Sequence, residues 1–590
     1  MPPDPAPGPD GPPLQRLQQR LKQKLRASEI AIVLLAALVG VGAGLVVVAM
    51  NAGMQALHVV IFRIGPDAHL SITPGIAVPL LLLGPALGGL AFGLASWRLA
   101  RRTGAPTVDP IEANALHGGR MSLGNSAVVA VQTLASSGVG ASVGLEAGYT
   151  QAASGLASAL GQWLHLRRAD LRLLVACGAG AAIGAAFDAP LMGAFYGFEL
   201  ILGTYAIPAF APMMTATFAA SLTRHMLGPV GNMPLPRLDV PPITHLPPAM
   251  LLGLLAALLG IAAMRGVTLV ETGFRRTGLP VWLRPALAGL VIGAIALWNP
   301  AVLSAGHGAV YHYIAADGAM LTFAALLAAK LSASALSIGA GFRGGLFFAS
   351  LMMGVFAGRL YAAGLDVLLP GNDGSPAFYA LIGMASLAVA VVGGPMTMTL
   401  LALEMTGDLR LTLAVLAASG IASLVTRRLF GFSFATWRFH LRGENIRGAH
   451  DVGWLQEITV ESLMRRDVPR LDLAMTAGEA RRLYPPGSSG AFVVLTAEGR
   501  YAGMLAPAIL DQASAETTLG ALLPPPGPTL SPGLTIRDAL TAFEADDAEA
   551  LAVVDGQEKV VGVLGEREAI RRYTDEMRRR LTELTGERTD

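Results

Sequence analysis

Long apolar stretches separated by short polar connections occupy most of the chain. The stretch from Ile30 to Phe62 contains no Asp, Glu, Lys or Arg and is long enough to cross a bilayer with some tilt. Further apolar stretches lie at 76–97, 123–139, 147–164, 171–184, 190–204, 206–223, 248–264, 284–299, 319–337, 345–363, 376–392, 395–406 and 411–426. This pattern predicts an all-helical, polytopic membrane domain over residues 29–445.

Several of these stretches are too short to span a bilayer alone, and glycines interrupt them. Irregular backbone is tolerated at membrane depth only where protein or a water-filled cavity satisfies its polar groups, which is typical of a transporter or channel core. The 53% hydrophobic content, 14% charged content and mean hydropathy of +0.54 agree with a lipid bilayer as the main surrounding. A net charge of +2 gives no reason to expect nucleic acid as a partner.

The two ends of the chain are polar. Residues 1–28 are rich in proline and then in Arg and Lys, which predicts a disordered basic segment, and the positive-inside rule places it in the cytoplasm. We expect both termini to be cytoplasmic and the protein to lie in a bacterial inner membrane. Residues 576–590 read as a charged surface helix or tail.

Glu146 lies in the segment LASSGVGASVGLEAGYTQAA, between glycines and small hydroxyl residues. An ionisable side chain at membrane depth indicates function, because burying it costs several kcal/mol unless a partner compensates, on the order of 3 kcal/mol on insertion scales. Gly144 and Gly148 weaken the helix locally, so we expect a new helix to begin near Glu146 with unpaired backbone N–H groups. Such a helix start attracts anions. A buried capping glutamate at a helix contact is the alternative interpretation.

A weak internal repeat predicts two related halves. APLMGAFYGFELI around Pro190 and GPMTMTLLALEMT around Pro395 each place a Glu nine positions after the Pro, at Glu199 and Glu404. Each element follows a glycine-rich break, the second being SIGAGFRGGLFFAS. Broken helices that meet near the bilayer midplane are the usual setting of an ion site. We interpret the two repeated glutamates as structural.

Four segments, taken in order and spacing, resemble the signature segments of the CLC chloride channels and chloride/proton exchangers: GLEAG, FDAPLMGAFYGFEL, GGLFFA and GGPMTMTLLALEMTGD. The resemblance covers roughly residues 30–445. It implies a homodimer of subunits, each with its own pore formed by two inverted halves. It also implies that chloride and related monovalent anions are carried, and that chloride sits among the N-termini of short helices.

The resemblance also assigns residues. Thr103 and Gly104 fall on the first anion-coordinating motif, Glu146 on the gating glutamate, and Phe434 on the tyrosine of the last membrane helix. The backbone amides of Leu346 and Phe347 are expected to contribute to the anion site. Arg343, beside the second break, is either a fixed attractor at the pore mouth or an interfacial arginine.

The chain departs from the family at several positions, and two of these departures bear on function. Phe434 has no hydroxyl, so one side-chain donor to the anion is missing unless another residue supplies it. Leu200 stands where the exchangers usually carry a second glutamate that relays protons from the cytoplasm. Because leucine cannot carry a proton, we expect passive, channel-like conduction gated by Glu146, with chloride/proton exchange as the alternative.

The C-terminal region changes character. AFVVL then YAGML, and later LAVVD then VVGVL, predict two small cytosolic α/β units at 455–512 and 515–575 that resemble a CBS-domain pair. The ribose-contacting signature survives only as GVLGERE, with Gly565 and Glu568 at altered positions, so we expect no cofactor and hold adenine-nucleotide binding doubtful.

Two other classes of protein fit less well. A CBS-regulated divalent-cation channel would need clustered oxygen ligands, and the membrane region has few Asp or Glu residues. An intramembrane enzyme would need a nucleophile or metal constellation, but no HExxH, GxSxG or pair of His at ligand spacing occurs there. The single cysteine, Cys177, excludes a disulfide framework and a cysteine-based metal site. We therefore expect no enzyme activity and no resident metal.

Overall fold

The computed structural model describes residues 29–101, 107–228, 245–369, 375–442, 459–467, 469–485, 492–496, 500–524, 527–546, 548–556, 559–572 and 574–575. The chain divides into two compact units, Met1–Asp451 and Val452–Asp590. The expected N-terminal segment 1–28, the tail 576–590, and Thr103 with Gly104 lie outside the described residues.

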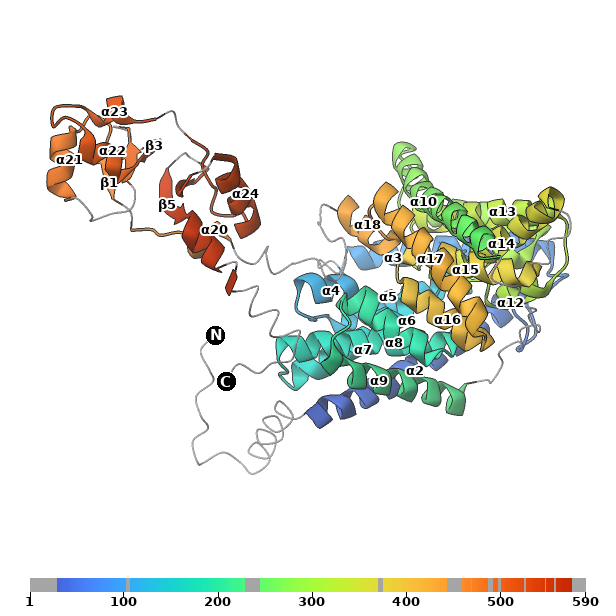
Figure 1. Ribbon diagram of the computed structural model, residues 1–590. Coiled ribbons are helices and arrows are strands. Elements are labelled where there is room, and N and C mark those ends of the chain that lie inside the picture. The colour runs from blue at the N-terminus through green and yellow to red at the C-terminus, as the bar shows by residue number, and fades with distance from the viewer. Residues whose placement is uncertain are drawn as a thin grey trace. The chain divides into compact units, whose positions relative to one another are not determined.

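The first unit is helical (Figure 1). Its first half contains α2 (Glu29–Phe62), α3 (Val78–Ala100), α4 (Pro110–Leu116), α5 (Leu123–Gly138), α6 (Glu146–Trp163), α7 (Arg168–Phe187), α8 (Pro190–Tyr196), the π-helix η1 (Gly197–Leu202) and α9 (Ile207–Leu227). Its second half contains α10 (Leu246–Arg276), α11 (Arg284–Trp298), the 3₁₀ turn η3 (Pro300–Val302), α12 (His307–Ala315), α13 (Met320–Gly339), α14 (Phe347–Leu368), α15 (Pro376–Val392), α16 (Pro395–Thr406), α17 (Leu409–Leu429) and α18 (Phe434–Leu441).

Helix lengths agree with a membrane domain. In the described part of the chain, seven helical stretches are long and apolar enough to cross a bilayer, and the longest run over Ile30–Phe62 and Leu409–Leu441. Shorter apolar helices lie between them, at Pro190–Leu202, Arg284–Trp298 and Pro376–Val392. The prediction of a polytopic helical unit with interrupted helices is therefore confirmed.

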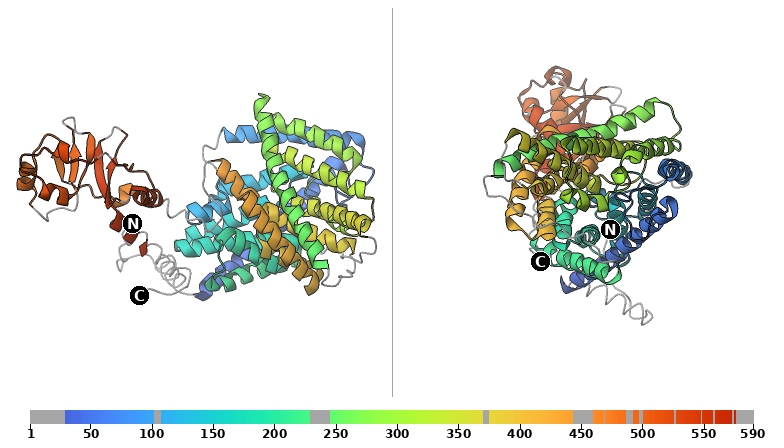
Figure 2. Two further views of the ribbon diagram at one scale, coloured as in Figure 1. Left: turned by 45° about the horizontal axis from the view of Figure 1, so that its top comes forward. Right: turned by 90° about the vertical axis from the view of Figure 1, so that its right-hand side faces the viewer.

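The packing of the helices repeats between the halves. In the first half, α2 packs on α9, α5 on α6, α6 on α7 and α8 on α9; in the second, α10 packs on α17, α13 on α14, α14 on α15 and α16 on α17. Two contacts join equivalent helices across the halves, α3 with α11 and α8 with α16. Figure 1 shows α8 beside α16, and both views of Figure 2 show blue-green helices of the first half next to orange helices of the second.

Small residues allow this close packing. A Cβ on Gly354 or Gly358 of α14 would overlap backbone atoms of α15, and a Cβ on Gly40 of α2 would overlap the backbone of α9. Membrane helices use such contacts because lipid supplies no hydrophobic force between them, so van der Waals packing must hold them together. The seventy glycines of the chain are thus partly explained by packing.

The second unit contains two small β-sheets. In the first sheet, β1 (Arg470–Asp472) pairs parallel with β2 (Phe492–Leu495), which pairs antiparallel with β3 (Tyr501–Leu505). In the second, β4 (Ala550–Val554) pairs antiparallel with β5 (Val560–Gly565), and Leu530 bridges Val553 in the parallel sense. Short helices complete the unit: α20 (Val460–Leu463), α21 (Ala477–Leu483), α22 (Pro507–Gln512), α23 (Leu519–Leu522) and α24 (Ile536–Asp546). The four strands predicted from the alternating pattern are all present.

Candidate functional site

The two glycine-rich breaks of the membrane unit lie against each other. Gly144 and Gly345 form an antiparallel bridge in which each backbone N–H donates to the other's carbonyl, at 3.1 and 3.4 Å. A serine from each half accepts a hydrogen bond from the backbone of the other half's break. Ser136, near the end of α5, accepts from the backbone N–H of Arg343 at 3.0 Å, and Ser337, near the end of α13, accepts from Ser142 at 2.9 Å. Ser136 and Ser337, Ser142 and Arg343, and Gly144 and Gly345 are separated by the same number of residues. The contact between the two breaks, called the joint below, therefore has approximate two-fold symmetry.

Glu146 is the first residue of α6. Its side chain is 3% exposed, and neither carboxylate oxygen has a hydrogen-bond partner among the residues that the structure describes. The carboxylate faces the backbone N–H groups of Glu146 itself and of Phe348 in the other half, without reaching hydrogen-bond geometry. A Cβ on Gly144 would overlap this carboxylate in its present position, so the Glu146 side chain would have to shift. The helix start thus buries a carboxylate that no described donor satisfies.

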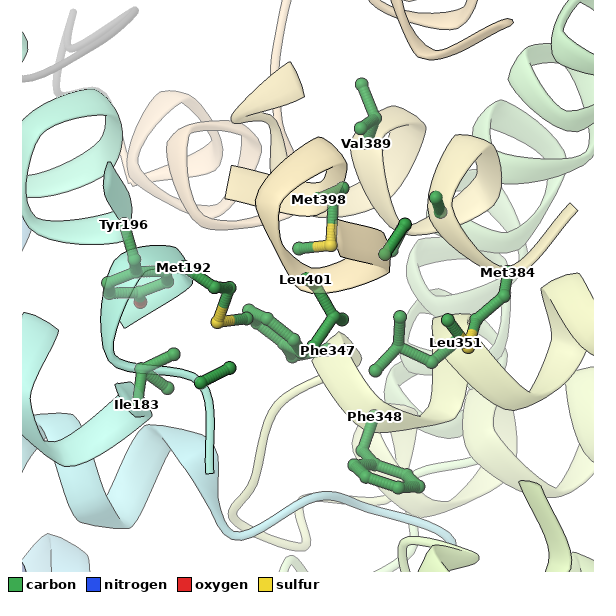
Figure 3. Packing of buried hydrophobic residues seen from close by; sticks show 14 of the residues in the cluster. Ile183, Met192, Tyr196, Phe347, Phe348, Leu351, Met384, Val389, Met398 and Leu401 are labelled. Atoms are coloured by element: carbon green, nitrogen blue, oxygen red, sulfur yellow. The ribbon is translucent and has the colours of Figure 1, made fainter. Parts of the chain in front are cut away.

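The second break starts α14 in the same way. Leu346 is the N-cap residue, Phe347 is the first helical residue, and no side chain caps either α6 or α14. An uncapped helix start leaves N–H groups unpaired and carries about half a positive charge. Figure 3 shows Phe347 between Met192 of α8 and Leu401 of α16, so apolar packing fixes this helix start. Two positive helix ends therefore converge at the joint, as the sequence predicted.

One cavity of about 340 Å³ gathers the predicted site residues. Glu146, Leu346 and Phe347 line it from the two breaks, Leu200 lines it from η1, and Phe434 lines it from the start of α18. Residues far apart in the chain thus meet in one space, which is the arrangement expected of an ion path. Thr103 and Gly104 remain predictions because they fall between the described residues 101 and 107.

Tyr196 and Asp109 are among the polar residues of this cavity that sequence reasoning missed. Tyr196 closes α8 and is 9% exposed, and Asp109 is the N-cap of α4, where its carboxylate accepts from the N–H of Ile111 at 2.8 Å. Asp109 immediately before Pro110 is a helix-start signal that was available in the sequence. Nothing in the sequence indicated that Tyr196 would face the cavity, because that depends on how α8 continues into the π-helix.

Cationic side chains line the outer part of the cavity. Arg442 forms an ion pair with buried Glu112 at 2.9 Å, whereas Arg343 and Arg438 are exposed and have no ion-pair partner in the described part of the chain. The Arg438 guanidinium lies 6.0 Å from the centre of the Phe434 ring. Exposed positive charge at an opening raises the local concentration of anions. This arrangement favours the interpretation of Arg343 as an attractor at the mouth.

Glu199 and Glu404, the repeated glutamates, cap helices. The Glu404 carboxylate accepts from the N–H groups of Leu191 and Met192 at 2.9 and 2.8 Å, and the Glu199 carboxylate accepts from Met396 and Thr397 at 3.0 and 2.9 Å. Each glutamate thus satisfies the first turn of the partner helix at the α8–α16 contact. This geometry supports their interpretation as structural residues.

Comparison with known proteins identifies the family. The family model described as "Voltage gated chloride channel" matches residues 88–427, which is more than half of the chain. The chain belongs to the CLC chloride-channel family. A CBS-domain model matches residues 522–575, within the strand-containing second unit.

Individual relatives agree with this assignment. The voltage-gated ClC-type chloride channel ClcB of Citrobacter koseri is 31% identical over 404 residues, covering 67% of this chain and 96% of the relative. The ClcB of Salmonella typhimurium is 30% identical over 408 residues, with the same coverage. The chain is thus a multi-pass membrane protein of a chloride-transport family.

Solved structures show the same fold at lower identity. A slow cyanobacterial Cl⁻/H⁺ antiporter superposes with a TM-score of 0.61 at 22% identity, covering 70% of this chain and 97% of the other. A eukaryotic CLC transporter superposes with a TM-score of 0.59 at 19% identity, covering 94% of this chain and 98% of the other. The second alignment extends beyond the membrane unit. The predicted fold class, with two helical halves and a small α/β region, is confirmed.

Proposed function

We propose that this protein conducts chloride passively through the cavity between its two halves, and that the Glu146 carboxylate is the gate. The observation that carries the proposal is the state of that carboxylate, which is buried without a hydrogen-bond partner in the described chain beside two uncapped helix starts. An anion entering the cavity would compete with the carboxylate for the same positive ends. Displacement of the side chain would open the path.

Weak donors suit this role. Backbone dipoles attract a halide without the strong hold of a buried Arg or Lys, and conduction requires an ion to leave as readily as it enters. The exposed arginines Arg343 and Arg438 lie at the outer part of the cavity, where they would concentrate anions without trapping them. Conduction by this route invokes no cofactor and no metal.

Leu200 supports passive conduction. This residue lines the cavity where the exchangers of the family carry a proton-relaying glutamate, and its side chain has no ionisable group. A second candidate function, proton-coupled exchange, is favoured by one observation. Asp109 lines the same cavity as Glu146 and would offer an alternative proton acceptor. Cl⁻/H⁺ antiport in a structural neighbour keeps this alternative open.

A flux assay on the purified full-length protein in liposomes tests both proposals. Under a chloride gradient, passive conduction predicts chloride uptake with no movement of protons against their gradient, monitored by a pH electrode. Proton movement that is stoichiometric with chloride, and lost in Asp109→Asn, would replace conduction by exchange. Absence of chloride uptake in the wild-type protein would reject both.

The assembly and setting are also proposals. We propose a homodimer with one cavity in each subunit, placed in a bacterial inner membrane with both termini in the cytoplasm. The basic residues that precede α2 support this orientation through the positive-inside rule. We further propose that the CBS-like pair acts structurally, without a bound adenine nucleotide.

A further inference from the structure

We propose that Tyr196 supplies the hydroxyl donor to the bound anion that Phe434 lacks. The inference rests on the proposed chloride function and specifies how this chain holds the ion. Both residues line the same cavity, Tyr196 from the end of α8 and Phe434 from the start of α18. A hydroxyl from the opposite wall would therefore reach the same ion from a different helix.

Burial of Tyr196 requires an explanation. Its side chain is 9% exposed, yet its hydroxyl has no hydrogen-bond partner in the part of the chain that the structure describes. The ring is buried, and a tyrosine hydroxyl at the edge of a buried ring usually has a hydrogen-bond partner. Among the described residues, the Tyr196 hydroxyl is not one of the unpartnered polar atoms that are sealed from solvent. Because Tyr196 lines the cavity, its hydroxyl is accessible from the open cavity. An occupant of the cavity would satisfy it.

Aromatic packing holds the ring beside the second helix start. The ring centres of Tyr196 and Phe347 lie 6.1 Å apart, and Figure 3 shows Tyr196 close to Met192 on α8, with Phe347 on the far side of Met192. Phe347 begins α14, whose unpaired N–H groups are expected to bind the anion. The Tyr196 ring therefore packs against the side chain of the residue at which the backbone already favours negative charge.

Other side-chain donors around the cavity are less suited. The hydroxyls of Thr133 and Thr150 donate to the carbonyls of Val129 and Glu146, at 2.8 and 2.9 Å. The Trp437 indole nitrogen has no partner in the described chain, but it is sealed from the open volume. Thr107 is half-buried on the cavity wall and serves as the comparison hydroxyl in the test.

The local backbone explains why Tyr196 faces inward. The helix changes from α to π directly after Tyr196, and Leu200 and Ile201 of the π-helix line the same cavity. A π-helix has a wider turn than an α-helix, so residues four apart stay close to one face. Tyr196 and Leu200 therefore both face the cavity, one polar and one apolar.

Chloride affinity, measured by calorimetry on the purified full-length protein, tests the inference. Tyr196→Phe removes only the hydroxyl and is expected to weaken chloride binding on the order of tenfold, which corresponds to about 1.4 kcal/mol. The double variant Tyr196→Phe with Phe434→Tyr returns a hydroxyl from the other wall and is expected to restore most of the affinity. A merely structural role of Tyr196 would not be rescued in this way.

Three controls make the result decisive. Tyr361→Phe removes a hydroxyl that donates to the Pro248 carbonyl outside the cavity, and chloride affinity should stay unchanged. Thr107→Val removes another cavity hydroxyl and should change affinity less than twofold, and Tyr196→Met should match Tyr196→Phe. Unchanged affinity in both Tyr196 variants, while the wild type still binds and transports chloride, would overturn the inference. A wild type that neither binds nor transports chloride would instead reject the proposed function.

Discussion

Glu199 and Glu404 each accept hydrogen bonds from the start of a helix in the opposite half of the membrane unit. Glu404, in α16, accepts from the N–H groups of Leu191 and Met192 in the first turn of α8. Glu199, in the π-helix η1 that directly follows α8, accepts from the N–H groups of Met396 and Thr397 in the first turn of α16. Gly394 takes a positive φ of 72° at the start of α16, and a Cβ there would crowd Glu199. The repeat seen in the sequence is thus a pair of mutual caps.

Glu404→Gln is predicted to destabilise the protein without closing the path. The amide keeps one acceptor oxygen but loses the charge, so one of two charge-assisted bonds is weakened or lost, at a cost of roughly 1.5–3 kcal/mol. Thermal unfolding of the detergent-solubilised protein should show a lowered midpoint, and Glu199→Gln should behave alike. An unchanged midpoint in both variants would show that the caps carry no stability.

Glu146→Gln is predicted to remove the pH response of chloride flux. In the wild type, acidification neutralises the carboxylate, weakens its hold on the helix ends and raises flux; the amide mimics this state at every pH. Isotopic chloride uptake into liposomes at acidic and neutral pH measures the effect. Glu199→Gln, which changes a capping carboxylate, should keep the wild-type pH response. A Glu146→Gln protein with the wild-type response would remove the gate.

Phe434→Tyr is predicted to strengthen chloride binding by about 0.5–1.5 kcal/mol, the contribution of one added hydrogen bond. The ring lines the cavity, so its para position offers a place for a donor. Calorimetry with chloride checks the change. Phe430→Tyr is the matched control, because Phe430 is not among the residues that line the cavity. Equal affinity in all three proteins would place Phe434 away from the ion.

Leu200 is predicted to determine that conduction is uncoupled from protons. In bilayers, the reversal potential of the wild type should follow the chloride gradient alone. Leu200→Glu should make it respond to a pH gradient at symmetric chloride, because an ionisable group then faces the cavity, whereas Leu200→Gln should not. A wild-type reversal potential that already shifts substantially with pH would identify an exchanger.

The sequence predicted the two helix starts because glycines flank Glu146 and precede Phe347, and glycine is the residue that breaks a helix at low steric cost. It also predicted β2, β3, β4 and β5 from their alternating apolar residues, but not the short β1. It did not predict the inward direction of Tyr196, because the change to a π-helix at Gly197 depends on packing rather than on any single residue. The backbone partners of Glu199 in α16 were equally hidden, since they lie in the other half of the chain.

Glu479 offers a pH test outside the membrane unit. The backbone N–H and hydroxyl of Thr476 both donate to its carboxylate at 2.9 Å, and these bonds lower the pKa of Glu479. Because the pKa of Glu479 is lower in the folded state than in the unfolded state, its ionised carboxylate stabilises α21 at pH values above the ordinary pKa of glutamate. This stabilisation is lost as the pH falls and the carboxylate is protonated. Hydrogen exchange of α21 amides in the full chain should therefore differ between wild type and Glu479→Gln at neutral pH and converge in acid. Equal exchange at neutral pH would show that the capping box adds no protection.

The mutual caps also impose an order of events during synthesis. The hydrogen bond from the Met396 N–H to the Glu199 carboxylate can form only after Met396, 197 residues further along the chain, has been synthesised. At about 5–20 residues per second, the ribosome needs roughly 10–40 s to deliver that partner. During this interval the nascent first half carries a carboxylate and open helix starts that lack their partners in the second half. Insertion of this protein therefore ends in a late closing step, in which both halves become complete together.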